Sequence, residues 1–243
     1  MNARVKDIII LEGINGCGKT TIANNETFHR LLLQNEYYQG YDGICVFKCP
    51  GDGISEVREL VKNPSNQFDL YTDINLIFAD MNELVVKKIY PELIKSKIII
   101  LDRCFHSTFV YQQASNYSKD ELISKIITDN VINIFGDTLL DRMVTFIFDI
   151  PYEISRDRRI KMSSNQSDRF ETELDNDFVK KGKQFEEKRK AYLKLALNTG
   201  KYEKLVLKDI FVLSGMGDLF HNICNILFYL NLINYVRSTE KLC

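Results

Sequence analysis

A glycine-rich segment near the N-terminus has the residue types and the spacing that bind phosphate groups. Residues 13–20 have the sequence GINGCGKT and match the pattern GxxxxGK(S/T). Glycines let such a backbone curl so that its N–H groups face phosphate oxygens, and the helix that follows adds partial positive charge. Lys19 is expected to reach the β- and γ-phosphates of ATP, and Thr20 to ligate Mg²⁺. The predicted cofactor-binding residues are Gly13, Asn15, Gly16, Cys17, Gly18, Lys19, Thr20 and Thr21. The motif alone indicates only an NTPase or a kinase.

A carboxylate and a guanidinium follow the apolar run at 97–101. They belong to Asp102 and Arg103, which stand next to each other at the expected end of a strand. Asp102 could hold a metal ion through water, and Arg103 could bind a phosphate with two parallel hydrogen bonds. A simple ion pair between the two side chains is the alternative that these residue types leave open.

Strands and helices alternate along the chain, and they must place these two groups together. Most of the short apolar runs are continuous Ile, Val, Leu or Phe, which is typical of strands buried on both faces of a parallel sheet. The predicted strands are 7–12, 44–48, 97–101, 143–150 and 204–208. The predicted helices are 19–35, 69–95, 119–135, 151–162, 174–197 and 217–237. This order predicts an α/β fold with a five-stranded parallel sheet covered by helices on both faces, and a ligand site beyond the carboxyl ends of the strands.

Composition and charge exclude several classes of function. The 243 residues carry a formal net charge of −1 with 27% charged residues, which gives no electrostatic case for a nucleic-acid or membrane partner. The six cysteines form no CxxC pair, so neither a zinc site nor a disulfide framework is expected. The first six residues lack the pattern of a signal peptide, and the apolar stretch 219–236 contains four asparagines. We therefore expect that stretch to be a packed helix and the protein to be cytoplasmic. The spacing of Asp218, Asn222, Asn225 and Tyr229 predicts one polar stripe on this helix.

Several segments in order along the chain resemble the thymidylate kinase family of P-loop nucleoside monophosphate kinases. The first strand, with the sequence IIILEG, is similar to the strand that enters that family's phosphate-binding loop. The family's strand ending in DRY, then a Ser and an Ala-Tyr-Gln run, is matched at similar spacing by residues 102–112. Further likeness lies at 47–53, 57–60, 76–80, 146–151, 156–159, 168–171 and 185–196. The resemblance covers roughly residues 5 to 210 and implies a P-loop kinase fold, ATP and Mg²⁺ as cofactors, and a nucleoside monophosphate as the substrate.

The resemblance also implies roles for particular residues. Phe78 would stack on the acceptor base, Arg103 would hold the acceptor phosphate, and Tyr111 would lie beside the sugar. The implied catalytic residues are Lys19, Asp102, Arg103, Arg156, Arg158 and Arg159, and the implied metal ligands are Thr20 and Asp102. The implied substrate-binding residues are Asn15, Pro50, Arg58, Phe78, Asn82, Arg103, Ser107 and Tyr111. Two plainer alternatives stay open: Phe78 as a core residue, and the basic run at 156–161 as a solvated helix face.

The chain departs from the family's pattern mainly on the acceptor side. Asn15 replaces an Asp or Glu, Cys49 a Glu, Asn82 an Arg that would face the base, and Cys104 a Tyr. His106 is also unusual at its position. Phosphoryl transfer is therefore better supported than the choice of base, which one substitution in a base-reading site can change.

The sequence favours ATP-dependent phosphorylation of a nucleoside monophosphate, with dTMP as the expected acceptor. Another deoxynucleoside monophosphate and a catalytically inactive nucleotide-binding homologue are the alternatives. A GTPase is disfavoured because the chain lacks an Asn-Lys-x-Asp motif. We expect one domain over 1–243, with a lid near 156–171 and an apolar C-terminal helix near 217–237. The family resemblance further implies a homodimer.

Overall fold

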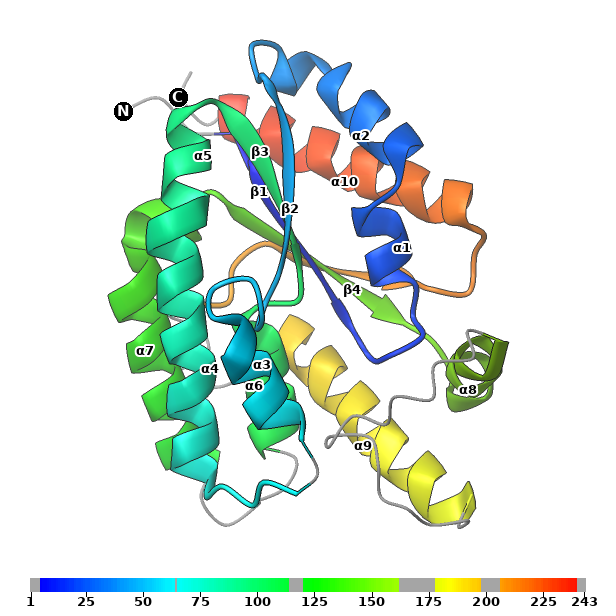
Figure 1. Ribbon diagram of the computed structural model, residues 1–243. Coiled ribbons are helices and arrows are strands. Elements are labelled where there is room, and N and C mark those ends of the chain that lie inside the picture. Colours follow the sequence, from blue (N-terminus) through cyan, green and yellow to red (C-terminus); the bar gives the residue numbers. More distant parts are fainter. Residues whose placement is uncertain (1–4, 64, 114–119, 162–177, 198–205, 240–243) are drawn as a thin grey trace.

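The computed structural model describes residues 5–63, 65–113, 120–161, 178–197 and 206–239. Its centre is a parallel five-stranded sheet in the order β2-β3-β1-β4-β5 (Figure 1). The strands are β1 (Ile8–Gly13), β2 (Gly43–Lys48), β3 (Lys97–Asp102), β4 (Met143–Asp149) and β5 (Ile210–Ser214). The predicted fold class is thus confirmed.

The three central strands are buried along almost their whole length, as their continuous apolar sequences predict. In β1, Ile8 pairs with Ile99 of β3 on one side and with Met143 of β4 on the other. This register brings the carboxyl ends of β1, β3 and β4 to the same edge of the sheet. Residues that follow these strands are therefore placed close together.

The fifth predicted strand, 204–208, was wrong. Residues 204 and 205 lie outside the described part of the chain, and Val206 and Leu207 are buried but precede the strand. The backbone turns at Asp209, whose φ is 50°, and β5 begins at the next residue. Both runs are apolar and short, so their composition did not show which one joins the sheet.

Helices α1 (Lys19–Ala23), α2 (Glu26–Leu33) and α10 (Leu219–Thr239) lie on one face of the sheet (Figure 1). Residues 19–35, predicted as one helix, form two helices because Asn25 takes an extended conformation and begins α2. Its side chain accepts a hydrogen bond from the Phe28 amide at 2.9 Å, as a helix N-cap does. A short 3₁₀ turn (Glu36–Tyr38) follows α2.

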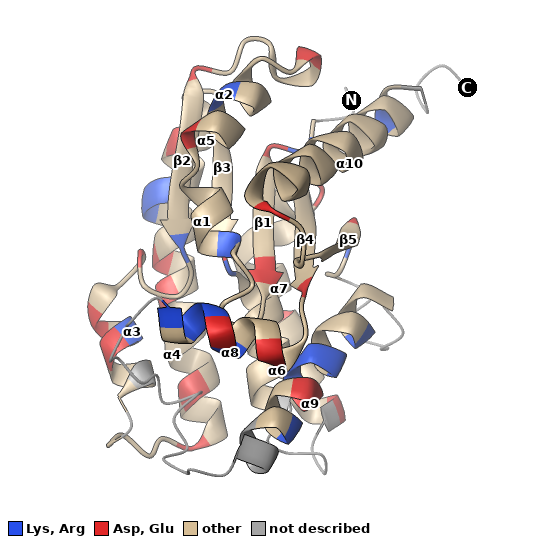
Figure 2. Ribbon diagram, turned by 90° about the vertical axis from the view of Figure 1, so that its right-hand side faces the viewer, with Lys and Arg blue, Asp and Glu red and all other residues tan. Residues whose placement is uncertain are grey.

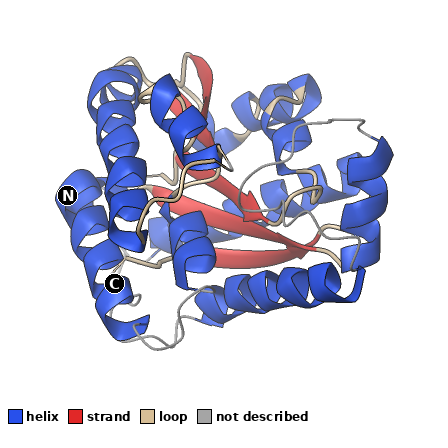
Figure 3. Cartoon of the chain, turned by 60° about the horizontal axis from the view of Figure 1, so that its bottom comes forward, coloured by secondary structure: helices blue, strands red, loops and turns tan. Residues whose placement is uncertain are grey.

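The other face carries α4, α5, α6 and α7 (Figure 1). Figure 3 shows the sheet with helices on both sides. Their bounds are α4 (Leu70–Leu84), α5 (Tyr90–Ile94), α6 (Phe105–Gln113) and α7 (Asp120–Leu140). A π-helical turn (Val85–Ile89) joins α4 to α5, so the predicted element 69–95 is essentially continuous. Asp69 begins it by accepting hydrogen bonds from the amides of Tyr71 and Thr72. The helix α6 was not predicted, although it carries two of the expected substrate-binding residues.

Three further helices complete the surroundings of the strand ends. They are α3 (Ser55–Lys62), α8 (Tyr152–Lys161) and α9 (Phe178–Leu197). Helix α8 follows β4 directly, and α9 packs against β4, β5 and α6. Of the expected lid at 156–171, only 156–161 is described, and it belongs to α8; residues 162–171 lie outside the described part of the chain.

The C-terminal helix α10 presents its faces differently from the expectation. Spacing predicted one polar stripe of Asp218, Asn222, Asn225 and Tyr229. Instead, Asn222 is buried, and the Tyr229 ring packs on Phe211 of β5 with the centroids 4.7 Å apart. Apolar side chains that include Phe220 and Phe228 lie exposed on α10, 62% and 63% accessible. Buried asparagines are tolerated because they form hydrogen bonds: the side-chain oxygen of Asn234 accepts one from the Lys6 amide at 3.1 Å.

None of the described helices is long and apolar enough to cross a membrane.

Candidate active site

The glycine-rich loop curls between β1 and α1 as the motif predicts. Gly13, Gly16 and Gly18 all have positive φ, at 133°, 77° and 98°. A side chain at position 16 would approach the Ser155 carbonyl of α8 to 2.8 Å, so the loop and α8 pack closely only with glycine there. The Ser155 hydroxyl donates a hydrogen bond to the Asn15 carbonyl at 2.7 Å, which joins the two segments further.

Lys19 lies buried at the start of α1, with its ammonium 3.4 Å from the Ile14 carbonyl of the same loop. Burial lowers the pKa of Lys19, the nearby Arg103 lowers it further, and Asp102 and Glu12 oppose the change. The lysine is thus held within the loop, beside the carboxylates of Asp102 and Glu12 at the ends of β3 and β1.

Thr20 and Asp102 meet across the edge of the sheet. The Thr20 hydroxyl donates to Asp102 Oδ2 at 2.6 Å, and the second carboxylate oxygen of Asp102 is buried without a hydrogen-bond partner among the described residues. A hydroxyl and a carboxylate are the hard oxygen donors that Mg²⁺ prefers, and Mg²⁺ keeps several waters, so it needs few protein ligands. The described residues include no cluster of three or more His, Cys, Asp or Glu side chains that could hold a metal. The oxygen donors of Thr20 and Asp102 are thus of the type that could hold Mg²⁺.

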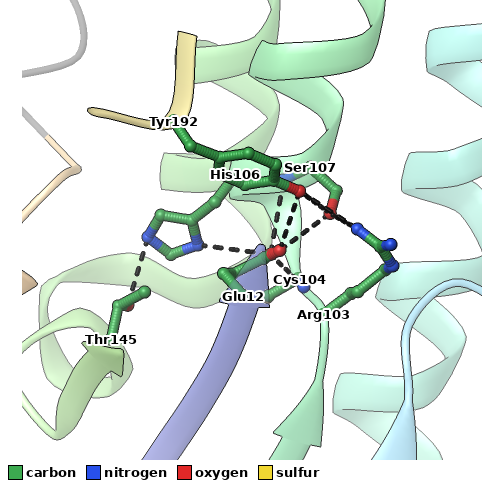
Figure 4. Close-up of polar contacts among 7 residues, drawn as sticks. All are labelled: Glu12, Arg103, Cys104, His106, Ser107, Thr145 and Tyr192. Carbon is green, nitrogen blue, oxygen red and sulfur yellow. Dashed lines mark hydrogen bonds and ion pairs between the residues drawn. The ribbon is translucent and has the colours of Figure 1, made fainter. Parts of the chain in front are cut away.

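Glu12, the residue before the loop, is completely buried at the end of β1. Its carboxylate accepts hydrogen bonds from the Cys104 amide at 2.7 Å, from the Ser107 hydroxyl at 2.8 Å and from the Tyr192 hydroxyl at 3.2 Å (Figure 4). Burial raises the pKa of Glu12, and Arg103, the Cys104 amide and the Ser107 hydroxyl oppose the rise. One carboxylate thus ties β1 to the start of α6 and to α9.

Arg103 stands on the outer side of this network. Its Nη1 donates to the Ser107 and Tyr192 hydroxyls, each at 3.0 Å, and its Nη2 donates to the Asn15 side-chain oxygen. Its backbone has a φ of 73°, which non-glycine residues rarely adopt, and its amide donates to the Leu11 carbonyl of β1 at 3.0 Å. The guanidinium is therefore held in one orientation beside the phosphate-binding loop.

The imidazole of His106 is almost completely buried next to Glu12. Its Nε2 is 3.2 Å from the Thr145 hydroxyl of β4, and its Nδ1 is 3.9 Å from a Glu12 carboxylate oxygen (Figure 4). Burial lowers the pKa of His106 to about 3, so the imidazole is neutral in the folded protein at ordinary pH.

The loop after β2 is organised by a buried carboxylate from α4. Asp80 accepts hydrogen bonds from the Gly51 amide at 2.8 Å and the Ile54 amide at 2.6 Å. Arg58 of α3 donates to the Pro50 carbonyl at 2.5 Å. Two expected substrate-binding residues, Pro50 and Arg58, are thus joined to each other.

Phe78 and Asn82 differ in exposure although they are four residues apart on α4. The Phe78 ring is almost completely buried, whereas Asn82 is exposed. The face of the helix changes from buried to exposed between them. Asn82 and Phe78 therefore do not share one enclosed site in the structure. The predicted role of this pair in binding the base stays a prediction.

Helices α8 and α9 both carry Lys and Arg residues, as Figure 2 shows. The three arginines of α8 have different contacts from one another. Arg156 pairs with its neighbour Asp157 at 2.8 Å on the surface. Arg158 donates to the Gly215 carbonyl at 3.0 Å and lies 3.4 Å from the Gly16 carbonyl, so it joins α8 to the back of the phosphate-binding loop. The side chain of Arg159 lies beside Gly16, since a Cβ built there would be 3.3 Å from its Cγ.

Comparison with known proteins shows which family this chain belongs to. The model of the family described as thymidylate kinase matches residues 11–209. The chain belongs to the thymidylate kinase family. It is 34% identical over 184 residues to the thymidylate kinase of Thermoanaerobacter sp. (strain X514), covering 73% of this chain and 84% of that protein. It is 32% identical over 174 residues to the thymidylate kinase of Caldanaerobacter subterraneus subsp. tengcongensis, covering 71% of this chain and 76% of that protein.

Two departures from the thymidylate kinase pattern, Cys49 and Cys104, lie together in the structure. Both are buried, and a hydrogen bond with the Cys104 thiol is the main cause that raises the pKa of Cys49. Burial acts in the same direction, so Cys49 is held as a thiol and not as a reactive thiolate.

Four residues that organise this site were not predicted from the sequence: Glu12, Asp80, Thr145 and Tyr192. Glu12 carried a signal, because a carboxylate at the end of an otherwise apolar buried strand must have partners. The other three lie within two helices and a strand whose patterns predict only packing, so their roles became visible only in three dimensions.

The buried His106 predicts a specific dependence of stability on pH. The unfolded chain takes up a proton on this residue near pH 6.5, whereas the folded protein does so only near pH 3. Folding stability is therefore lost as pH falls from about 6.5 toward 3, by up to about 1.4 kcal/mol for each pH unit. Urea unfolding at pH 7 and pH 5 should show a smaller loss in His106→Gln than in the wild-type protein.

The exposed His221 of α10 supplies the matched control. His221→Gln should keep the wild-type dependence of stability on pH. An equal loss of stability in the wild-type protein and in His106→Gln would contradict the buried neutral state of His106.

Proposed function

We propose that this chain transfers the γ-phosphoryl group of ATP to dTMP and forms ADP and dTDP. The observation that carries this proposal is the placement of Arg103. Its guanidinium is fixed by Ser107, Tyr192 and Asn15, directly beside the phosphate-binding loop. A planar guanidinium held next to a triphosphate site suits an acceptor that itself bears a phosphate.

The donor side needs a cradle for the phosphates and positive charge where negative charge moves. The loop amides and Lys19 would hold the ATP phosphates. Thr20 and Asp102 would hold Mg²⁺, which neutralises charge on the phosphates when bound. Membership in the thymidylate kinase family supports this choice of cofactors.

On the acceptor side, the neutral side chain of Asn15 affects the charge around Arg103. Its amide oxygen accepts a hydrogen bond from Arg103 but carries no charge. The contact with Asn15 therefore adds no negative charge beside Arg103. Ser107 and Tyr111 follow Arg103 at intervals of four residues, so they share one side of α6 and would line the path of the sugar.

The α8 arginines divide into two groups as candidates for the transferring phosphoryl group. Arg158 is bonded to carbonyl oxygens behind the loop, so it would stabilise the loop. Arg159 lies beside Gly16, and Arg156 is on the surface, so these two would supply positive charge to the transferring phosphoryl group. The phosphate-binding loop has a glycine at position 16 and no cation there, so the positive charge must come from another segment.

An inactive homologue is disfavoured by the completeness of the site. Lys19, Thr20, Asp102 and Arg103 are all present, and all four are buried or held by hydrogen bonds that would be costly without a function. We also propose that the whole chain, 1–243, is one kinase domain.

The proposed function is tested with a panel of acceptors. ADP release is measured with ATP and each ribo- and deoxynucleoside monophosphate, with thymidine as the control that lacks a phosphate. Turnover should be fastest with dTMP and negligible with thymidine. Preference for a purine monophosphate would overturn dTMP as the substrate, and no turnover with any acceptor would overturn the kinase.

Arg103→Lys keeps the positive charge but loses the paired hydrogen bonds. The KM for dTMP should rise about 10-fold or more, since hydrogen bonds to charged groups contribute about 1.5–3 kcal/mol. The KM for ATP should change little. Arg30→Lys on the exposed side of α2 is the matched control and should behave like the wild-type enzyme. A rise in the KM for ATP alone would show that Arg103 serves the donor.

We propose that two copies of the chain associate through the exposed apolar side of α10. The side chains involved are Phe220, Phe228, Leu232 and Tyr235, at spacings that place them along one side of the helix. No Asp, Glu, Lys or Arg occurs between residues 219 and 236, so two such surfaces can meet without burying a charge.

Sedimentation equilibrium at micromolar concentration should show a dimer of the wild-type chain. Phe228→Ser together with Phe220→Ser should shift it to monomer, because both side chains are more than half exposed and need not disturb the core. A wild-type protein that is entirely monomeric would contradict this association.

A further inference from the structure

Helices α6 and α9 face each other through two pairs of side chains. Ser107 and Tyr111 are four residues apart on α6, and Tyr192 and Lys188 are four residues apart on α9. The Ser107 and Tyr192 hydroxyls are 2.9 Å apart, and the Lys188 ammonium lies 4.8 Å from the centre of the Tyr111 ring. One helical turn separates the two contacts on each helix, so the hydrogen bonds of Tyr192 determine where Lys188 lies.

The Arg103 guanidinium also lies near the Tyr111 ring. Its guanidinium carbon is 5.5 Å from the centre of the Tyr111 ring. An aromatic face attracts either cation, but two cations gathered at one ring also repel each other. A phosphate bound beside the ring would be attracted by both cations, and the place where they meet adjoins the phosphate-binding loop through Asn15.

We infer that Lys188 is a second cation for the phosphate of the acceptor, acting together with Arg103. The inference builds on the proposed function, because it assigns a binding residue to the acceptor side of that reaction. Arg103 would fix the orientation of a phosphate monoester with its planar donors, and Lys188 would contribute a compact charge from α9. The ligand class is a nucleoside 5′-monophosphate.

The plain alternative is a solvated lysine on the outside of a helix. Lys190 and Lys194 of α9 are of this kind, since both are exposed. Lys188 differs because it is partly buried and placed on an aromatic ring of the site. The chain therefore offers a matched control two residues away, with the same charge on the same helix.

The test compares Lys188→Gln, Lys190→Gln and Lys188→Arg in the full-length enzyme. Steady-state kinetics give the KM for dTMP and for ATP, and calorimetry gives the affinities for dTMP and for thymidine. Lys188→Gln should raise the KM for dTMP about 10- to 100-fold and weaken dTMP binding similarly, with ATP and thymidine nearly unchanged. Lys188→Arg should recover most of the affinity for dTMP, and Lys190→Gln should match the wild-type enzyme.

Equal KM values for dTMP in Lys188→Gln and Lys190→Gln would overturn the role of Lys188 and leave the proposed kinase intact. Weaker binding of thymidine as well as dTMP, or a lower melting temperature in Lys188→Gln alone, would also overturn it, because such a change indicates packing and not phosphate binding. Failure of the proposed function looks different: the wild-type enzyme would then not turn over dTMP.

Discussion

The burial of one carboxylate, Glu12, is the constraint on which the rest of the site depends. A carboxylate removed from water costs several kcal/mol, roughly, unless hydrogen bonds and positive charge offset that cost. Glu12 obtains them from the Cys104 amide, Ser107 and Tyr192, with Arg103 close by. These partners come from α9 and from the segment where β3 ends and α6 begins. Satisfying Glu12 therefore brings together parts of the chain that are far apart in sequence.

In the hydrogen-bond network around Glu12, the negative charge is buried and the positive charge of Arg103 lies nearer the phosphate-binding loop. Glu12 stabilises the cations around it but is too deeply buried to meet a substrate. Arg103 shares the Ser107 and Tyr192 hydroxyls with Glu12 and extends outward to Asn15 beside the phosphate-binding loop. Positive charge thus lies at the outer end of the network, where phosphate groups would bind. A site prepared in this way needs little reorganisation when the negative charge arrives.

Much of this organisation follows from the sequence. Continuous apolar runs predicted four of the strands, because strands buried on both faces need apolar residues at every position. The loop motif and the Asp102–Arg103 pair were placed at the correct edge of the sheet. The prediction of the fifth strand was wrong, since two short apolar runs lie close together and composition does not show which one joins the sheet. The prediction of the exposed side of α10 was also wrong, since the spacing of asparagines does not show which side of the helix is covered. The partners of Glu12 could not be predicted, because hydrogen bonds between distant helices leave no periodic signal.

Glu12 positions Arg103 through the Ser107 and Tyr192 hydroxyls that both residues contact, and a double-mutant cycle tests this coupling most directly. Calorimetry would give the affinity for dTMP of the wild-type enzyme, Glu12→Gln, Arg103→Lys and the double variant. If Glu12 positions Arg103, the two losses should be strongly non-additive, with a coupling of about 1 kcal/mol or more. Losses that simply add would contradict the claim, because the two residues would then act on dTMP binding independently.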